Sequence, residues 1–405
     1  MQNKEVGIGI LGLGNVGRGV LFTLKNNKDF IGQELSPSKV KVVGLVDLDE
    51  GRKPDSSFGY QFFTRDAQEV ITHPDIQIVV EAIGGEYPAY NLIKQALEAG
   101  KHVVTPNKEV VAKHGYELIR IAHQHNVQFL FETSVASAIP ILGTMVNMIT
   151  SAPLDEISGI LNGTTNYVLE LMLEQDMSQA EAIKKAQEMG YAEADPEKDI
   201  DGWDALYKIF ILATLGFRGK LNLDQIEPTG ISKIILADLK LAKEMGYSIK
   251  LVATARKVAN NKKLHFGVRP VLVPCTHLLS HIHGANNGIF LSGNGYGELF
   301  FFGAGAGGLA GASMIISDII RIIREPAKFD YNFLLQNVKE WEIERAEQGG
   351  QAGKHYFIRL ELEDKQENSE NISRILSELG LPVERAAELR QKDKENNLNI
   401  GLITD

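Results

Sequence analysis

The sequence has a single cysteine, no block of basic residues and no long uninterrupted apolar run. Cys275 alone cannot form an intrachain disulfide, and a formal net charge of −10 does not favour nucleic acid or an anionic membrane as a partner. The stretch 299–323 is apolar, but it contains several glycines and the charged Asp318 and Arg321, so we expect a buried loop and helix there. The apolar run at 6–11 is too short for a signal peptide, which favours the cytoplasm. Small molecules are therefore the expected partners.

The first 50 residues carry a strand–turn–helix pattern that is typical of dinucleotide binding. The apolar run at 6–11 precedes the turn, and a helical pattern of apolar residues follows it through Leu24. Glycines in such a turn let the backbone approach a pyrophosphate, whose charge the helix N-terminus stabilises. The residues expected to contact the cofactor here are Gly12, Leu13, Gly14, Asn15, Val16 and Gly17.

Asp47, at the end of a second apolar run at 41–46, indicates which cofactor is preferred. A carboxylate in this position accepts hydrogen bonds from the adenosine ribose and repels a 2′-phosphate, so we expect NAD in preference to NADP. The spacing from the glycine turn is longer than usual, and we expect the polar stretch 26–38 to be a loop insertion that accounts for it. Arg52 and Lys53 lie close enough to leave NADP open.

Strand patterns and helical patterns continue to alternate as far as residue 131. We expect strands at 76–82, 102–105 and 127–131 and helices at 87–99 and 109–125, which together predict a doubly wound parallel sheet. Ligands bind at the carboxyl ends of the strands in such sheets, and a lysine there would lie near the nicotinamide. The residues expected at this edge are Ile83, Gly84, Thr105 and Lys108.

The helix expected at 202–217 is apolar nearly all round, so we expect it to be buried. Its only charges, Asp204 and Lys208, stand four residues apart on one face. One interpretation is an ordinary ion pair at a helix end. The other is a lysine held by carboxylates in a cleft, where its pKa can be tuned for proton transfer. The pattern alone leaves both interpretations open.

These segments together resemble the homoserine dehydrogenase family. The likeness covers about residues 5–330 and rests on the turns at 12–17 and 105–108, the motif at 159–167, the stretch 193–208 and the segment 268–271. It implies NAD(P)-dependent interconversion of L-homoserine and L-aspartate 4-semialdehyde by hydride transfer, a step toward threonine, isoleucine and methionine. Another NAD-dependent amino-acid oxidoreductase and a catalytically idle amino-acid sensor are the alternatives.

The resemblance also implies the roles of individual residues. Lys208 corresponds to the acid/base lysine, while Glu193 and Asp204 correspond to residues that hold the substrate ammonium. Lys108 corresponds to a second essential lysine between nicotinamide and substrate, where a cation can polarise the aldehyde oxygen. These roles suit the chemistry, because an ammonium needs buried carboxylates and an alcohol losing hydride needs a base. Glycines that contact the cofactor correspond to Gly190 and Gly307.

The loop from 132 to 139 resembles the monovalent-cation loop of the family. Hard oxygen ligands suit Na⁺. The family usually has a glycine pair where this chain has Ser137 and Ala138. The resemblance implies the side chain of Glu132 and the backbone carbonyls of Val135, Ser137 and Ile139 as ligands.

Two polar patterns in the middle of the chain are not assigned to catalysis. His281 and His283 are expected to share one face of a strand, and without a clustered partner they do not predict a metal site. No histidine stands at a triad-like position near the polar residues of the 159–167 motif. We expect these residues to serve a subunit-pairing sheet or to line the active-site cleft: Asn162, Thr164, Thr165 and Asn166.

After a polar, glycine-bearing stretch, the tail resembles a partial ACT-type amino-acid-sensing module. We expect strands at 356–362, 383–389 and 398–403 and a helix at 372–379. The ligand loop of this module commonly carries Pro-Gly, which the segment 363–368 lacks. Threonine is the effector that the resemblance suggests.

We therefore predict an α/β protein with a Rossmann-type doubly wound parallel sheet, a second α/β domain and a partial ACT-like α+β module. The dinucleotide-binding domain is expected at 1–135 and the substrate-binding, catalytic and dimerisation domain at 136–330, with the 303–330 segment returning to the cofactor domain. A linker is expected at 331–353 and the ACT-like domain at 354–405. We expect a homodimer or higher homo-oligomer.

Overall fold

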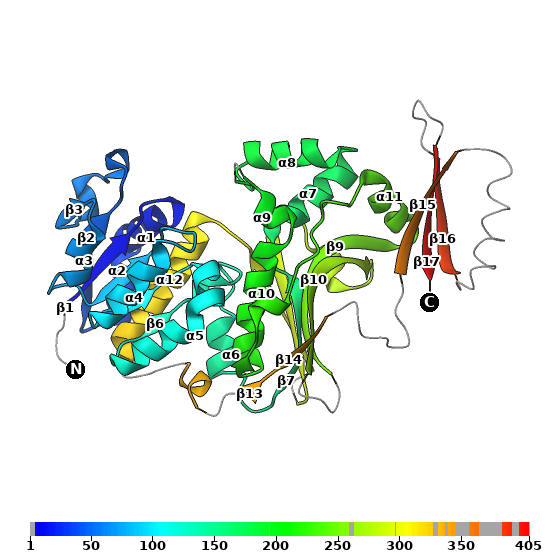
Figure 1. The fold of residues 1–405 in the computed structure, drawn as a ribbon. Helices are drawn as coiled ribbons and strands as arrows, with labels where there is room; N and C mark the ends of the chain where they lie inside the picture. The colour runs from blue at the N-terminus through cyan, green and yellow to red at the C-terminus, as the bar shows by residue number, and fades with distance from the viewer. Residues whose placement is uncertain are drawn as a thin grey trace.

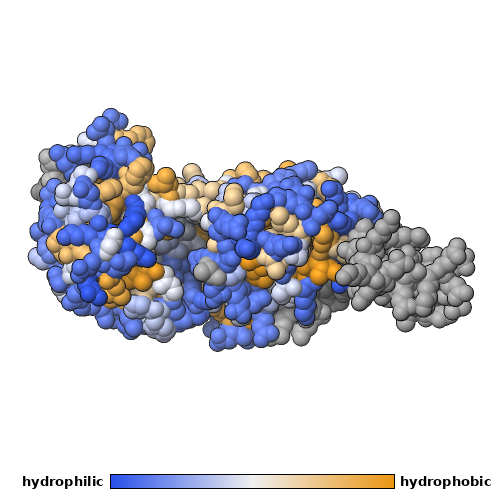
Figure 2. Space-filling view, turned by 90° about the horizontal axis from the view of Figure 1, so that it is seen from above, coloured by the Kyte–Doolittle hydropathy of each residue, from blue (hydrophilic) through white to orange (hydrophobic). Residues whose placement is uncertain are grey.

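The computed structural model describes residues 5–193, 195–258, 263–295, 297–326, 331–336, 339–345, 356–363, 383–390 and 397–404. Three parts follow one another in Figure 1: an N-terminal α/β part, a middle part built on a large mixed sheet, and a small three-stranded sheet near the C-terminus. Figure 2 shows hydrophilic residues over most of one face, with apolar residues gathered in separate patches. No helix among the described residues is long and apolar enough to cross a membrane.

The N-terminal part contains a six-stranded parallel sheet, which confirms the predicted doubly wound fold. The strand order β3-β2-β1-β4-β5-β6 reverses direction between β1 and β4, and ligands bind in the crevice at such a point. Helices cover the sheet, so β1 and β4 are buried along nearly their whole length. The strands are β1 (Glu5–Leu11), β2 (Lys39–Val46), β3 (Phe62–Thr64), β4 (Ile78–Glu81), β5 (His102–Val104) and β6 (Phe129–Leu130).

The longest helix of this part begins at a residue of the candidate site. The side chain of Asn107 accepts a hydrogen bond from the backbone N–H of Val110, which caps the helix and makes Lys108 its first residue. The helices are α1 (Asn15–Asn26), α2 (Lys28–Leu35), α3 (Ala67–Thr72), α4 (Ala89–Glu98) and α5 (Lys108–Gln124).

One prediction for this part is wrong. The stretch 26–38, expected as a loop insertion, contains the helix α2. Ile31 and Leu35 lie one turn apart on α2 and are buried, on a helix that packs against β2 and the distant helix α12. Because the rest of the stretch is polar, these two apolar residues at helical spacing give only a weak helical pattern, and the helix was not predicted.

The middle part contains a second six-stranded sheet, in the order β12-β11-β7-β9-β10-β14. Neighbouring strands are antiparallel, except that β14 runs parallel to β10. The strands are β7 (Leu154–Ile160), β9 (Tyr247–Lys257), β10 (Lys263–Pro274), β11 (Asn286–Gly293), β12 (Gly297–Ala304) and β14 (Glu342–Arg345).

The helix predicted at 202–217 is α10, and it is buried along most of its length as its apolar surface predicted. It packs against β7 and β9 on one side and against α5 of the N-terminal part on the other. α10 therefore joins the two parts. The helices here are α6 (Leu142–Asn147), α7 (Gly163–Glu174), α8 (Gln179–Glu188), α9 (Glu197–Ile200), α10 (Trp203–Gly216) and α11 (Leu236–Glu244).

After β12 the chain returns to the N-terminal part. The helix α12 (Gly308–Arg324) packs against α1, and Figure 1 shows it, in yellow, beside the blue helix. The two backbones approach closely, because a Cβ added to Gly19 of α1 would lie 2.4 Å from the carbonyl oxygen of Gly308. The start of α12 is therefore held beside α1.

The stretch 331–353, expected as a linker, contains regular structure where it is described. β13 (Lys339–Glu340) pairs with β8 (Gly219–Lys220), and β14 joins the second sheet. Trp341, between these strands, is buried, and its Nε1 donates to the carbonyl oxygen of Phe217 at 3.3 Å. The buried Trp341 thus holds this segment against the middle part. The polar composition of the segment did not predict this contact.

The three strands predicted in the tail are confirmed as β15 (Tyr356–Glu363), β16 (Val383–Arg390) and β17 (Asn397–Thr404). They form an antiparallel sheet in the order β15-β17-β16. The helix predicted at 372–379 lies outside the described residues. The sheet packs on α11, where Ile403 contacts a cluster with Leu241 and Met245 and the Nε of Arg359 lies 2.7 Å from Asp238 Oδ1. The tail therefore contacts the middle part directly.

Candidate active site

Two lysines from different parts of the chain meet at one buried carboxylate. The Nζ of Lys108 lies 2.7 Å from Asp204 Oδ1, and the Nζ of Lys208 lies 2.7 Å from Asp204 Oδ2. Lys108 opens α5, whereas Asp204 and Lys208 lie on α10. Lys208 Nζ also donates to the carbonyl oxygen of Leu161 at 2.8 Å. The structure thus brings together three residues that the sequence singled out.

The start of α10 places Asp204 in its first turn. Gly202, which precedes the helix, has a φ of 87° that only glycine adopts without strain. A Cβ there would also lie 3.2 Å from the Cβ of Pro228 and 3.3 Å from Cγ1 of Val268, so the backbone fits tightly against its neighbours. A carboxylate in the first turn is favourably placed near the helix N-terminus.

The charges around Asp204 favour its ionised form. Burial opposes the charge on Asp204, but Lys108 and Lys208 outweigh it and lower the pKa of Asp204. Asp204 in turn raises the pKa of Lys108 against the effect of burial, with smaller contributions from Asp199 and Glu193. The ammonium of Lys108 meets this carboxylate while 41% of the lysine side chain stays exposed. The group therefore holds charged lysine and aspartate side chains in direct contact.

Asn162 is a buried neighbour of this group for which the sequence suggested no catalytic role. Its Nδ2 donates to Asp199 Oδ1 and to Asp204 Oδ2, each at 2.8 Å. Its Oδ1 accepts from the backbone N–H of Thr165 at 2.7 Å and caps α7. An asparagine between a strand and a helix predicts such a cap. The two carboxylate contacts could not be predicted, because they come from residues 37 and 42 positions away.

Glu193 lies outside the hydrogen-bonded group. It is exposed on the segment between α8 and α9, and its backbone carbonyl accepts from Gln187 Nε2 at 3.0 Å. Its charge contributes to the raised pKa of Lys108, so it acts on the group electrostatically. Gly190, three residues earlier, has a φ of 76° at the end of α8.

The glycine turn joins β1 to α1 as predicted. Gly12 has a φ of 94°, and a Cβ added to Gly17 would lie 2.0 Å from the carbonyl oxygen of Gly12, so both positions require glycine. Gly307 precedes α12 beside this turn, since a Cβ on the next residue would lie 2.7 Å from the carbonyl oxygen of Asn15. The N-termini of α1 and α12 therefore meet at the turn, where both can stabilise a negative charge.

Asp47 follows β2 and connects it to the glycine turn. Its Oδ2 accepts from the backbone N–H of Leu13 at 2.8 Å, and its Oδ1 accepts from that of Asp49 at 3.0 Å. Arg52 Nη1 lies 3.5 Å from Asp47 Oδ2, and Arg52 Nε lies 3.5 Å from Asp49 Oδ2. Burial raises the pKa of Asp47, but the two N–H groups and Arg52 together lower it below the ordinary value. An ionised carboxylate thus lies beside the turn.

Glu81, the last residue of β4, is a site residue that was not predicted from the sequence. Its Oε1 accepts from the N–H groups of Ile83 at 2.7 Å and Gly84 at 3.3 Å, while its Oε2 accepts from Thr105 Oγ1 at 2.5 Å. Burial raises the pKa of this carboxyl group. Glu81 therefore contacts three residues that were predicted to bind the cofactor: Ile83, Gly84 and Thr105. A lone acidic residue at the end of an apolar strand is the sequence pattern that could have identified Glu81.

The predicted cation loop is arranged around the carboxylate of Glu132. Its Oε1 accepts from the N–H of Leu142 and its Oε2 from that of Gly143, both at 2.7 Å, at the start of α6. Burial raises the pKa of Glu132, while the positive charge of Arg321 acts in the opposite direction. The carbonyl of Ile139 already accepts from Ile141 at 2.8 Å. Each oxygen of the Glu132 carboxylate thus accepts one N–H and keeps further acceptor capacity, and the cation site stays a prediction.

His281 and His283 do not share a strand, which corrects that expectation. His281 ends a 3₁₀ helix (Leu278–His281). His283 Nδ1 lies 3.5 Å from Glu170 Oε1, and with Glu174 they place three potential ligand atoms within 4.8 Å of one another. Exposed acidic groups commonly cluster without a metal, and nothing further at this cluster indicates a ligand.

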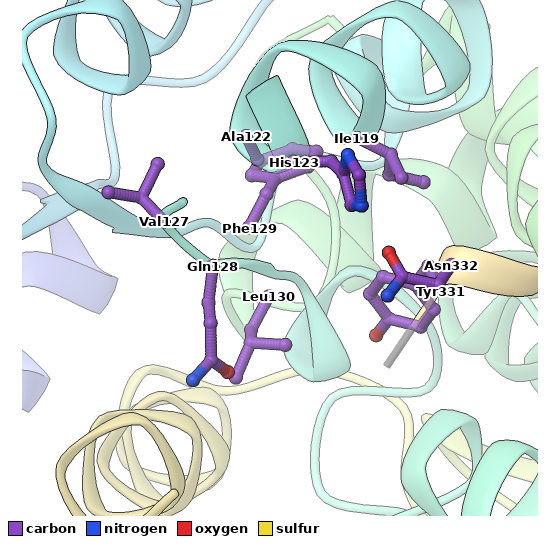
Figure 3. A pocket seen from close by; sticks show the side chains of 9 residues that line it. All are labelled: Ile119, Ala122, His123, Val127, Gln128, Phe129, Leu130, Tyr331 and Asn332. Carbon is purple, nitrogen blue, oxygen red and sulfur yellow. The ribbon is translucent and has the colours of Figure 1, made fainter. Parts of the chain in front are cut away.

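Two pockets lie elsewhere in the N-terminal part. One is lined by the later half of α5, by β6 and by Tyr331 and Asn332, and Figure 3 shows these side chains around it. Its residue Ala122 lies about 21 Å along α5 from Lys108 at 1.5 Å per residue, so this pocket is separate from the lysine–carboxylate group. The other opens beside the glycine turn, where Arg18 and Lys53 line it.

Comparisons with known proteins agree with this geometry. The family model "Homoserine dehydrogenase, NAD binding domain" matches residues 12–132, and the model "Homoserine dehydrogenase" matches residues 140–320. A homoserine dehydrogenase of Bacillus subtilis is 33% identical over 99% of this chain and 92% of its own length. The crystal structure of one from Thiobacillus denitrificans superposes with a TM-score of 0.87 at 32% identity, covering 100% of this chain and 92% of the other. A hyperthermophilic archaeal homoserine dehydrogenase in complex with NADPH has a TM-score of 0.63 at 26% identity and covers 78% of this chain and 97% of its own.

Proposed function

The chain belongs to the homoserine dehydrogenase family and catalyses the NAD(P)-dependent interconversion of L-homoserine and L-aspartate 4-semialdehyde, and we propose that Lys108, Asp204 and Lys208 carry its chemistry. The observation that supports this assignment is the buried carboxylate held between two lysines at 2.7 Å each. The direct test follows NADH or NADPH formation with homoserine, with serine as the shorter control substrate. Equal turnover of both alcohols would contradict a site built for homoserine.

Lys208 acts as the acid/base group. Oxidation of homoserine removes a hydride from the carbinol carbon and a proton from the hydroxyl group, and the nicotinamide, when bound, accepts the hydride. Lys208 in its neutral form takes the proton, and its ammonium form returns the proton in the opposite direction. The contacts of Lys208 Nζ with Asp204 and with the Leu161 carbonyl, at 2.7 and 2.8 Å, support this role because they hold the nitrogen in one position.

The ammonium of the substrate replaces Lys108 at Asp204. A zwitterionic amino acid needs a carboxylate for its ammonium, and Lys108 Nζ is a group of the same type and charge beside Asp204 Oδ1. Lys108, once displaced, turns toward the substrate oxygen and stabilises the negative charge that develops there. Glu193, exposed on the neighbouring segment, supplies the second carboxylate for the ammonium.

The enzyme prefers NAD to NADP. Asp47 supports this proposal because its ionised carboxylate would repel a 2′-phosphate beside the glycine turn. Arg52, a cation that could receive this phosphate, instead contacts Asp47 and Asp49. The contacts to the cofactor come from the turn at 12–17, from Ile83, Gly84 and Thr105, and from the glycines Gly190 and Gly307.

The active form is a homodimer. β12 is an edge strand of the second sheet, and its Phe302 is 57% exposed. An edge strand offers unpaired backbone groups, and an exposed aromatic adds apolar area that a second copy can cover. Light scattering at micromolar concentration tests this, and a monomeric mass for the active enzyme would contradict it.

Threonine, as the effector, would bind the tail and act through the contact of the tail sheet with α11.

A further inference from the structure

The motif at 159–167 contains a buried residue that has no part in the proton transfer described above. Asn162 is 3% exposed, and its amide nitrogen has two hydrogens, both of which are used. One points to Asp199 Oδ1 and the other to Asp204 Oδ2, each with a nitrogen–oxygen distance of 2.8 Å. One amide group thus bridges the two carboxylates.

The orientation of this amide is fixed from its other end. The Oδ1 of Asn162 accepts from the backbone N–H of Thr165 at 2.7 Å and from the hydroxyl of Thr165 at 2.8 Å. A backbone N–H can only donate, so the oxygen of the amide must face Thr165 and the nitrogen must face the carboxylates. The start of α7 therefore determines which way the bridge points.

The bridge lies where two like charges are close. Burial and the neighbouring Asp204 raise the pKa of Asp199. The groups that face this pair are Lys108 from α5, Lys208 from α10, Asn162 from the start of α7 and the charge of Glu193. Among these, Asn162 is the neutral group, and it donates to both carboxylates at once without adding a charge. A donor shared by two carboxylates stabilises the ionised form of each.

We propose that Asn162 is a positioning residue for the reaction: its amide holds the carboxylates of Asp199 and Asp204 in place and orients Asp204 with Oδ2 toward Lys208 and Oδ1 toward the position that the substrate ammonium takes from Lys108. This inference rests on the proposed roles of Asp204 and Lys208. A simple helix cap would need only the oxygen of the side chain, whereas the bridge needs the nitrogen.

Substitutions that keep the cap and remove the bridge test this difference. Asn162→Ser retains an oxygen that caps α7 but cannot reach both carboxylates, and Asn162→Asp adds a third carboxylate beside them. The pKa of the pair then rises. In the aldehyde-reducing direction Lys208 starts protonated, so we expect the acid limb of the pH profile of kcat/KM to move upward in the order wild type, Asn162→Ser, Asn162→Asp. For Asn162→Ser we expect a shift of at least about half a pH unit and a loss of at least about tenfold in kcat/KM.

Thr165→Val is the matched control, because it removes the hydroxyl contact at the same helix start, keeps the backbone N–H that orients the Asn162 amide and touches neither carboxylate. It should change thermal stability and leave the acid limb where it is in the wild type. The pH dependence of the melting temperature gives a readout that does not need turnover: the wild type should be more stable than Asn162→Ser near neutral pH, where the bridge stabilises the ionised carboxylates, and this difference should shrink as the pH falls and the carboxylates take up protons. A Ser variant with the wild-type acid limb and wild-type stability profile would overturn the inference, whereas a wild type that does not oxidise homoserine would overturn the proposed function instead.

Discussion

Lys108 and Asp204 form an ion pair of 2.7 Å across the boundary between the N-terminal part and the middle part. The next residue makes a second contact across the same boundary, since Glu109 Oε2 lies 2.8 Å from the Nζ of Lys198. The start of α5 is therefore tied to both α9 and α10. Lys108, which follows β5 of the N-terminal sheet, is in this way held against the carboxylate of Asp204 in the middle part.

Lys108→Ala should lower kcat by at least about 100-fold if Lys108 stabilises charge on the substrate oxygen. Homoserine should still bind, because the substitution leaves Asp204 free for its ammonium. Steady-state kinetics with saturating cofactor measures both quantities. Lys94→Ala, which removes a lysine paired with Glu117 on the exposed side of α4, is the control and should behave as the wild type. An unchanged kcat for Lys108→Ala would remove this lysine from the mechanism.

Asp47→Ser should shift the cofactor preference toward NADP. The substitution removes the charge that repels a 2′-phosphate and frees Arg52 from one of its two partners. We expect the ratio of kcat/KM for NAD to that for NADP to exceed one in the wild type and to fall by at least about tenfold in the variant. A wild-type ratio below one would mean that Asp47 does not contact the ribose and that a nearby cation receives the phosphate.

The sequence predicted the elements that depend on local pattern and missed contacts between distant segments. Five strands of the first sheet, all but β3, the buried helix α10 and the three tail strands follow from periodicity and from glycine and cap residues. The contact of Glu81 with Thr105 and the bridge made by Asn162 could not be predicted, because their partners come together only when separate strands and helices meet. The helix α2 was missed for a different reason, since two apolar residues in a polar stretch give a weak signal.

Removal of the residues after Gly350 should leave kcat/KM for homoserine within about twofold of the wild type, because every residue placed in the site precedes this point. The truncation uncovers Leu241 and Met245 and leaves Asp238 without Arg359, so the melting temperature should fall. Arg359→Ala is the milder variant, with an expected loss of about 1 kcal/mol for one partly buried pair. If the tail senses threonine, threonine inhibits the full chain and not the truncated one.

A truncated protein without activity would also test the role of the tail. A chain that remains folded by circular dichroism but does not turn over homoserine would show that the tail completes the active enzyme. The modular account of the tail would then be wrong.

Lys250 should make stability rise with pH in the alkaline range. Its Nζ is buried and donates to Asn166 Oδ1 at 2.9 Å and to the carbonyl of Ile282 at 2.7 Å, and burial lowers its pKa to about 8. Between about pH 8 and the ordinary value of 10.5, the unfolded chain binds the proton more strongly than the folded one, so raising the pH stabilises the fold. The melting temperature of the wild type minus that of Lys250→Met should therefore increase from pH 8 to pH 10. A constant difference would show that this lysine is charged in the folded protein throughout.

The measurement that bears most directly on the central claim is the single-turnover rate of Lys208→Ala with homoserine and NAD. If Lys208 takes the hydroxyl proton, the rate of NADH formation should fall by at least about 100-fold while homoserine binding, measured by calorimetry, remains detectable through Glu193 and Asp204. Small primary amines added to the variant should restore part of the rate, since they can replace the missing base. A near-normal rate without added amine would contradict the assignment of Lys208 as the acid/base group.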